Sequence, residues 1–139
     1  MGNGLTQSAG PRVFVMPLLV TAAVALMHCL PGADLNADDW WAQWHMDKLL
    51  HLIAFGMWGL TWAIALAKQR RLQRAWHLEF GVLVAAVIFG MVLEAIQGAW
   101  MPGRTFDLAD VIADLAGAAC SLGLFSSIFG RRPGRIASD

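Results

Sequence analysis

The chain has 139 residues, of which 58% are hydrophobic and 14% are charged, and its mean hydropathy is +0.55. A soluble domain of this size usually carries about 25% charged residues, so this deficit excludes an ordinary soluble domain and indicates a chain surrounded by lipid. The ten basic residues equal the ten acidic ones in number. Because the basic residues fall in short groups beside apolar segments, the sequence predicts no nucleic-acid surface and no nucleic-acid partner.

Four apolar segments each have about the 20 residues that a helix needs to cross hydrocarbon roughly 30 Å thick. They run from Val13 to about Leu30, from about Asp47 to Ala67, from about Leu78 to Gln97, and from about Leu108 to Phe129. The sequence therefore predicts an all-α membrane protein with four transmembrane helices. We divide it into an N-terminal tail (1–12), a four-helix membrane domain (13–129) and a basic C-terminal tail (130–139).

Basic residues are divided unequally between the two sides of this membrane domain. Eight of them precede the first segment, connect the second to the third, or follow the fourth: Arg12, Lys68, Arg70, Arg71, Arg74, Arg131, Arg132 and Arg135. Lys48 and Arg104 are the two on the other side. Because loops rich in lysine and arginine stay in the cytoplasm, the sequence predicts that both chain termini are cytoplasmic.

Polar and ionisable residues enter the apolar segments, or flank them, at the predicted external end. They are Asp47, Lys48, His51, Glu94, Gln97, Arg104, Asp107, Asp110 and Asp114. A charge in hydrocarbon costs on the order of several kcal/mol, so such residues turn away from lipid and usually serve a function. Helical spacing places Asp107, Asp110 and Asp114 on one face and brings Asp47 and His51 together on another. The sequence thus predicts one polar site near the outer membrane boundary.

Five of these residues are carboxylates. A cluster of five negative charges is unfavourable unless cations, bound protons or a ligand reduce its charge. Three interpretations remain open. The group could be a structural network that holds the helices in register. It could bind the polar head of an amphipathic ligand, with Lys48, His51 and Arg104 contacting phosphate or carboxylate. It could also perform acid–base or metal-assisted chemistry, for which His51 and Glu94 are the candidate catalytic residues.

The sequence has no recognised spacing for metal ligands. Cys29 and Cys120 lie in different apolar segments and form no CxxC or Cys/His pattern, and no HExxH motif occurs. We interpret both cysteines as small core residues, and the isolated His28 as a core or interface residue. No metal site and no cofactor are therefore expected.

The polar residues also form a pattern that resembles the VanZ-like family of small bacterial membrane proteins. The positions that carry the resemblance are Asp47-Lys48-x-x-His51-x-x-x-Phe55, Glu94-x-x-Gln97 and Arg104-x-x-Asp107-x-x-Asp110-x-x-x-Asp114-x-x-Gly117. The similarity extends from about Trp44 to Gly123. This chain has Asp114 where the family pattern usually has Asn, which adds a titratable group.

The family is named for a protein associated with resistance to the glycopeptide antibiotic teicoplanin. The resemblance therefore implies a multi-pass protein of the bacterial inner membrane that acts in the cell envelope. The partners it implies are membrane lipids and a lipid-linked cell-wall or polysaccharide precursor, whose head group the polar residues would contact. It leaves open whether the chain is an enzyme.

Overall fold

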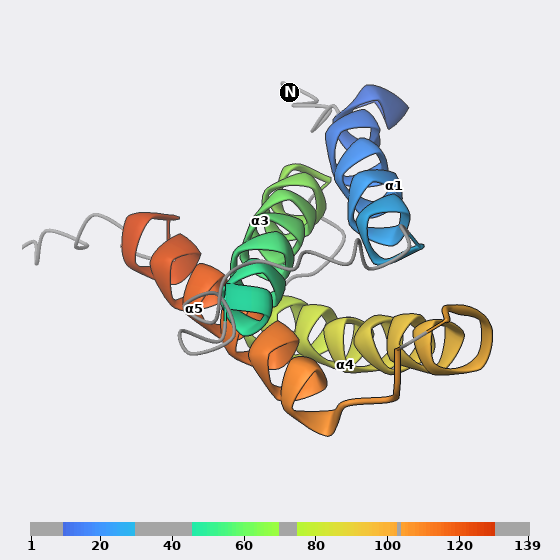
Figure 1. Cartoon of the computed structure of the whole chain (residues 1–139). Helices are drawn as coiled ribbons and strands as arrows, with labels where there is room; N and C mark the ends of the chain where they lie inside the picture. The colour runs from blue at the N-terminus through green and yellow to red at the C-terminus, as the bar shows by residue number, and fades with distance from the viewer. Residues whose placement is uncertain (1–9, 30–45, 70–74, 103, 130–139) are drawn as a thin grey trace, which may run out of the picture.

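The computed structural model describes residues 10–29, 46–69, 75–102 and 104–129. A short 3-10 helix, η1 (Pro11–Phe14), leads into α1 (Val15–Cys29), which is followed by α3 (Met46–Lys68), α4 (Ala75–Trp100) and α5 (Leu108–Phe129) (Figure 1). Four helical spans are long and apolar enough to cross a membrane, and their bounds lie within a few residues of the predicted segments. The predicted all-α architecture is confirmed, since the described residues contain no strand.

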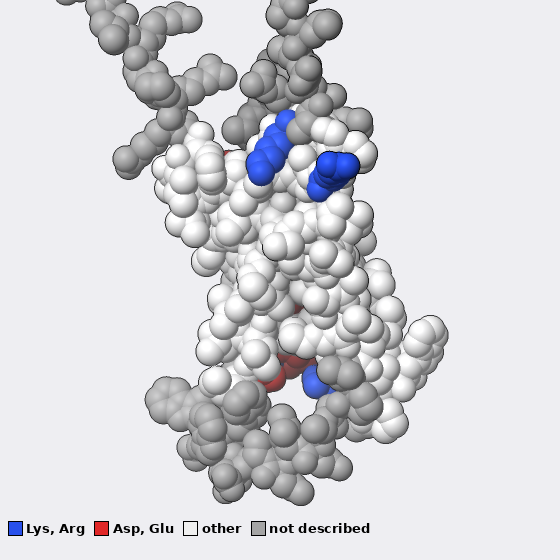
Figure 2. Space-filling model, turned by 90° about the horizontal axis from the view of Figure 1, so that it is seen from above, with Lys and Arg blue, Asp and Glu red and all other residues white. Residues whose placement is uncertain are grey.

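The helices alternate in direction, so each end of the bundle gathers residues that are distant in sequence. At one end, Gln97 of α4 donates a hydrogen bond to the main-chain carbonyl of His28 at the end of α1. At the other end, Gln69 donates to the carbonyl of Gly10. Figure 2 shows basic side chains at one end of the described surface, and carboxylates beside a basic side chain at the other. The side of the membrane that each end faces stays a prediction from the basic loops.

The helix α3 occupies the centre and contacts α1, α4 and α5. Its Phe55 is fully buried, and the rings of Phe55 and Trp58 each lie 5.6 Å from the ring of Phe89 on α4. The outer helix faces carry exposed apolar side chains, as lipid contact requires. Cys29 and Cys120 are both exposed, so their interpretation as core residues was wrong. Lipid tails are as apolar as a protein core, and an apolar segment therefore does not reveal which of its residues face inward.

Small residues allow α3 and α5 to pack with their main chains in contact. A Cβ atom placed on Gly117 would lie 2.1 Å from the carbonyl oxygen of Leu52. One placed on Gly59 would lie 2.8 Å from Ser121 Oγ and 3.3 Å from the Cα of Ala118. Such close approach of helices through small residues is typical of membrane proteins. This close packing holds the start of α5 against the start of α3, where the polar residues lie.

Thr21 joins α1 to α3 because its hydroxyl accepts hydrogen bonds from two indole N–H groups, those of Trp58 (2.9 Å) and Trp62 (3.1 Å). We expect Thr21→Val, which keeps the side-chain shape, to lower the free energy of unfolding by about 1–2 kcal/mol, because two partly buried donors lose their acceptor. Equilibrium unfolding in detergent measures this loss. Thr61→Val is the control, since the Thr61 hydroxyl donates to a carbonyl of its own helix. An equal loss in both variants would contradict a role in helix–helix contact.

Candidate functional site

Lys48, in the first turn of α3, lies among three carboxylates. Its Nζ is 2.8 Å from Asp110 Oδ1 and 3.0 Å from Asp107 Oδ2. The more exposed Asp47 lies 3.4 Å away. Asp107 also accepts a hydrogen bond from the main-chain N–H of Ala109, which satisfies a donor of the first turn of α5. Lys48 therefore connects the start of α3 to the start of α5.

Asp107 lies just outside the membrane-spanning part of α5, and its side chain is 46% exposed. The hydrogen bond from Lys48 holds the pKa of this carboxyl below its ordinary value. The ionised Asp107 carboxylate therefore stabilises the folded chain at neutral pH. This stabilisation is lost as the pH falls through the lowered pKa of Asp107.

His51 is buried one turn beyond Lys48, between α1 and α5. Its Nδ1 lies 2.9 Å from Oδ1 of the fully buried Asp114, and 3.4 Å from Nε2 of His28. Nδ1 of His28 lies 2.7 Å from the carbonyl oxygen of Val24, which can only accept. In the neutral His28 ring, the proton is thus on Nδ1, and the lone pair of Nε2 points toward His51.

Helix α4 contributes Glu94 and Gln97 from one face. Glu94 is 1% exposed, and its Oε2 accepts a hydrogen bond of 3.1 Å from the main-chain N–H of Asp107. Gln97 Nε2 lies 2.9 Å from the carbonyl oxygen of His28. Glu94 Oε1 and Asp114 Oδ2 are buried and have no hydrogen-bond partner among the described residues. Two carboxylate oxygens in this core thus have unused acceptor capacity.

Arg104 is half-buried in the connection between α4 and α5. Its main-chain N–H donates to the carbonyl of Met101 at 3.2 Å. Within the part of the chain that the structure describes, its guanidinium has no ion pair or hydrogen bond. No anion of the described residues therefore occupies its five N–H donors, whereas the ammonium of Lys48 already contacts three carboxylates.

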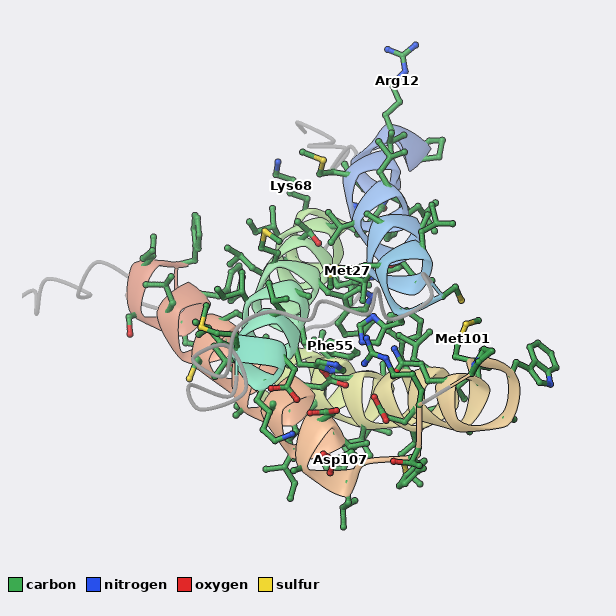
Figure 3. All side chains as sticks on the ribbon, viewed as in Figure 1. Arg12, Met27, Phe55, Lys68, Met101 and Asp107 are labelled. Carbon is green, nitrogen blue, oxygen red and sulfur yellow. The ribbon has the colours of Figure 1, made fainter. Side chains whose placement is uncertain are left out.

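The structure brings most of the predicted site residues into one cluster, which we call the polar core: Lys48, His51, Glu94, Gln97, Asp107, Asp110 and Asp114. Asp47 contacts this core only through Lys48 and is largely exposed. In Figure 3, side-chain nitrogen and oxygen atoms gather between the labelled Phe55 and Asp107, in the middle of the bundle. That these residues bind a ligand stays a prediction.

His28 adjoins the polar core and is the residue of the site that the sequence analysis missed. It is buried, which agrees with its interpretation as a core residue. Its ring meets the ring of His51 edge-on at 4.6 Å, so it is not isolated as expected. The alternation of four helices could have identified it, because the end of the first predicted helix and the start of the second lie at the same side. Two groups, His28 with His51 and Asp114, and His51 with Glu94 and Asp110, have a geometry that could hold a metal ion.

The chain is similar in sequence to a known protein family. The VanZ/LLP1 family model matches residues 11–130, a range that contains every residue of the polar core. An uncharacterized protein of Schizosaccharomyces pombe is 30% identical over 118 residues, which is 84% of this chain and 60% of that protein. The chain thus spans about 60% of the length of this relative. No solved structure matches the chain. Since the family model covers most of the sequence, from the first helix to the end of the last, the chain belongs to the VanZ/LLP1 family.

Proposed function

We propose that the chain is a multi-pass protein of the bacterial inner membrane that binds the anionic head group of an envelope lipid or lipid-linked cell-wall precursor at the outward end of the bundle. The observation that carries this proposal is Arg104, a half-buried guanidinium without a protein anion in the described residues. Arginine binds phosphate and carboxylate groups through two parallel hydrogen bonds. A phosphate at this position would supply the anion that the described residues do not give Arg104.

The charges of the polar core decide which residue would contact the anion. Lys48 is held by Asp107 and Asp110, so an added anion there would have to displace a carboxylate. Arg104 has no such competitor in the described chain. We therefore assign the anionic group to Arg104. The carboxylates of the core would accept hydrogen bonds from hydroxyl or amino groups of the same head group.

An apolar groove between α3 and α5 supports an amphipathic ligand. Its walls begin at Leu52 and Ile53, directly after His51, and continue along the helices to Leu60 and Leu124. An acyl or prenyl chain in this groove would leave its head group at the end of the bundle where the polar core lies. The tail would thus contact α3 and α5, and the anion would bind Arg104 in the connection that leads into α5.

The test compares lipid binding by native mass spectrometry of the detergent-purified chain, with phosphatidylglycerol and a polyprenyl phosphate as probes and phosphatidylcholine as the reference. We expect the wild-type chain to prefer an anionic probe, and Arg104→Ala to lose about 10-fold of this preference, because a hydrogen-bonded charge pair contributes about 1.5–3 kcal/mol. Arg12→Ala is the control, since Arg12 is an exposed basic residue at the opposite end. If both variants keep the wild-type preference, Arg104 does not bind the anion.

The contact between His51 and Asp114 favours a second candidate function, acid–base catalysis on such a lipid. A buried carboxylate that accepts from Nδ1 orients an imidazole and stabilises its protonated form. This function predicts that the purified chain converts a labelled lipid-linked precursor and that His51→Gln abolishes the conversion. We also propose that this site contributes to teicoplanin resistance, which predicts that a strain carrying Arg104→Ala or His51→Gln loses that resistance.

A further inference from the structure

We infer that His28, His51 and Asp114 form a binding site for a divalent transition-metal ion, with Zn²⁺ as the reference ion. One ligand atom from each of the three residues lies within 4.8 Å of the others. Ligand atoms around a bound Zn²⁺ lie about 2.0–2.2 Å from the ion and hence roughly 3–4 Å from one another. Small side-chain movements would therefore complete the site. It does not depend on Arg104 or on lipid binding.

The hydrogen bonds of the two rings suit metal ligation. His28 uses Nδ1–H to bind the carbonyl of Val24 at 2.7 Å, which leaves the lone pair of Nε2 directed at His51. A histidine that ligates a metal usually donates its other ring N–H to a carbonyl or carboxylate in this way. When Nδ1 of His51 ligates an ion, its proton moves to Nε2, which lies 4.0 Å from Asp110 Oδ2.

The unused acceptors of the polar core point to a cation that the described residues do not supply. Asp114 is 0% exposed, and its Oδ2 has no partner in the described chain. Glu94 Oε1, in the adjoining group with His51 and Asp110, is likewise buried and unpartnered among the described residues. Among the described residues, Asp110 is the one of these three buried carboxylates that contacts an ammonium, that of Lys48. Buried charge without compensation is strongly unfavourable. A divalent cation would offset the two remaining negative charges.

The donor set selects the class of metal. Two imidazoles and one carboxylate favour Zn²⁺, Fe²⁺, Mn²⁺ or Co²⁺ over Mg²⁺ and Ca²⁺, which prefer oxygen ligands. Three protein ligands leave at least one coordination position for water or for an oxygen atom of another molecule. The expectation of no metal site rested on local spacing, whereas these ligands come from α1, α3 and α5, and spacing along one helix carries no information about such a set.

The test uses the full chain in detergent, stripped with a chelator and then titrated with Zn²⁺, Co²⁺ and Mg²⁺ while bound metal and thermal stability are measured. We expect about one Zn²⁺ per chain, a higher melting temperature with Zn²⁺ but not Mg²⁺, and a Co²⁺ absorption spectrum typical of nitrogen and oxygen ligands. Failure of the wild-type chain to bind Zn²⁺ or Co²⁺ at micromolar concentration overturns the inference by itself.

Variants then locate the ion. His28→Gln and Asp114→Asn are expected to weaken Zn²⁺ binding about 100-fold or more, since each removes a ligand. His77→Gln, at an exposed position near the opposite end, is expected to bind as the wild type does. Circular dichroism and gel filtration identify variants that fail to fold. Asp114→Asn is used because it keeps the side-chain shape and so disturbs folding least. Unchanged binding in folded His28→Gln and Asp114→Asn chains would overturn the site. Arg104→Ala is expected to keep the metal, which separates this test from that of lipid binding.

Discussion

Gly117→Ala is expected to lower the free energy of unfolding by about 3 kcal/mol or more, a large effect for one methyl group. The added Cβ would lie 2.1 Å from the carbonyl oxygen of Leu52 and 3.0 Å from the main-chain nitrogen of Gly56. Both neighbours are backbone atoms of α3, so no side-chain rotation relieves the clash and the helices must separate. Overpacking of a rigid contact typically costs about 1–3 kcal/mol, and a clash with backbone lies at the upper end. Equilibrium unfolding in detergent measures the loss.

Gly123→Ala is the matched control on the same helix. A Cβ at Gly123 meets nothing within 4 Å, and alanine has the better helix propensity by about 1 kcal/mol. We expect this variant to be as stable as the wild type or slightly more stable. Equal free energies of unfolding for the Gly117→Ala and Gly123→Ala chains would contradict the close packing of α3 and α5.

The same contact sets the geometry of the polar core. Gly117 lies about one turn from Asp114 on α5, and Leu52 directly follows His51 on α3. Separation of the helices at Gly117 would therefore lengthen the 2.9 Å contact between His51 Nδ1 and Asp114 Oδ1. We expect Gly117→Ala to reduce binding at the polar core even where the protein still folds. The small residues of this interface thus serve the site as well as the fold.

The number and approximate bounds of the helices could be predicted from the sequence because the membrane thickness sets a minimum apolar length. The polar residues of α3 and α5 could also be placed together. Asp110 and Asp114 form a stripe that cannot face lipid, so charge fixes the rotation of α5 about its axis. The alternation of the helices then brings this stripe to the same end as Lys48 and His51.

The inward face of α1 could not be predicted in this way. It has one buried ionisable residue, His28, and its other residues are nearly as stable in lipid as in the core. The rotation of α1 is set instead by contacts that require three-dimensional structure, such as those of Thr21 with the two indoles. The sequence also left open whether Lys48 pairs with carboxylates of the chain or with an external anion. Sequence spacing shows that opposite charges are near one another but not which of them pair.

Lys48→Met is expected to lower the free energy of unfolding by about 3 kcal/mol, because it leaves Asp110 buried without its cation. The Asp110 side chain is 7% exposed and lies 2.8 Å from Lys48 Nζ. Breaking a buried ion pair by removing one partner costs about 3–5 kcal/mol, and the 28% exposure of the Lys48 side chain places this pair at the lower end. Equilibrium unfolding in detergent measures the effect. Lys68→Met, at the exposed end of the same helix, is expected to change stability by less than about 0.5 kcal/mol.

A double variant separates the loss of charge compensation from the loss of packing. In the Lys48→Met chain, Asp110→Asn removes the uncompensated negative charge and keeps the side-chain shape, so we expect it to restore more than about half of the lost stability. Asp107→Asn in the same chain is expected to restore little, since the Asp107 carboxylate is 46% exposed and water can solvate it. If neither substitution restores stability, Lys48 acts through the packing of its aliphatic part. If Asp107→Asn is the better of the two, the main partner of Lys48 is the exposed carboxylate, and the connection between α3 and α5 lies at the membrane surface.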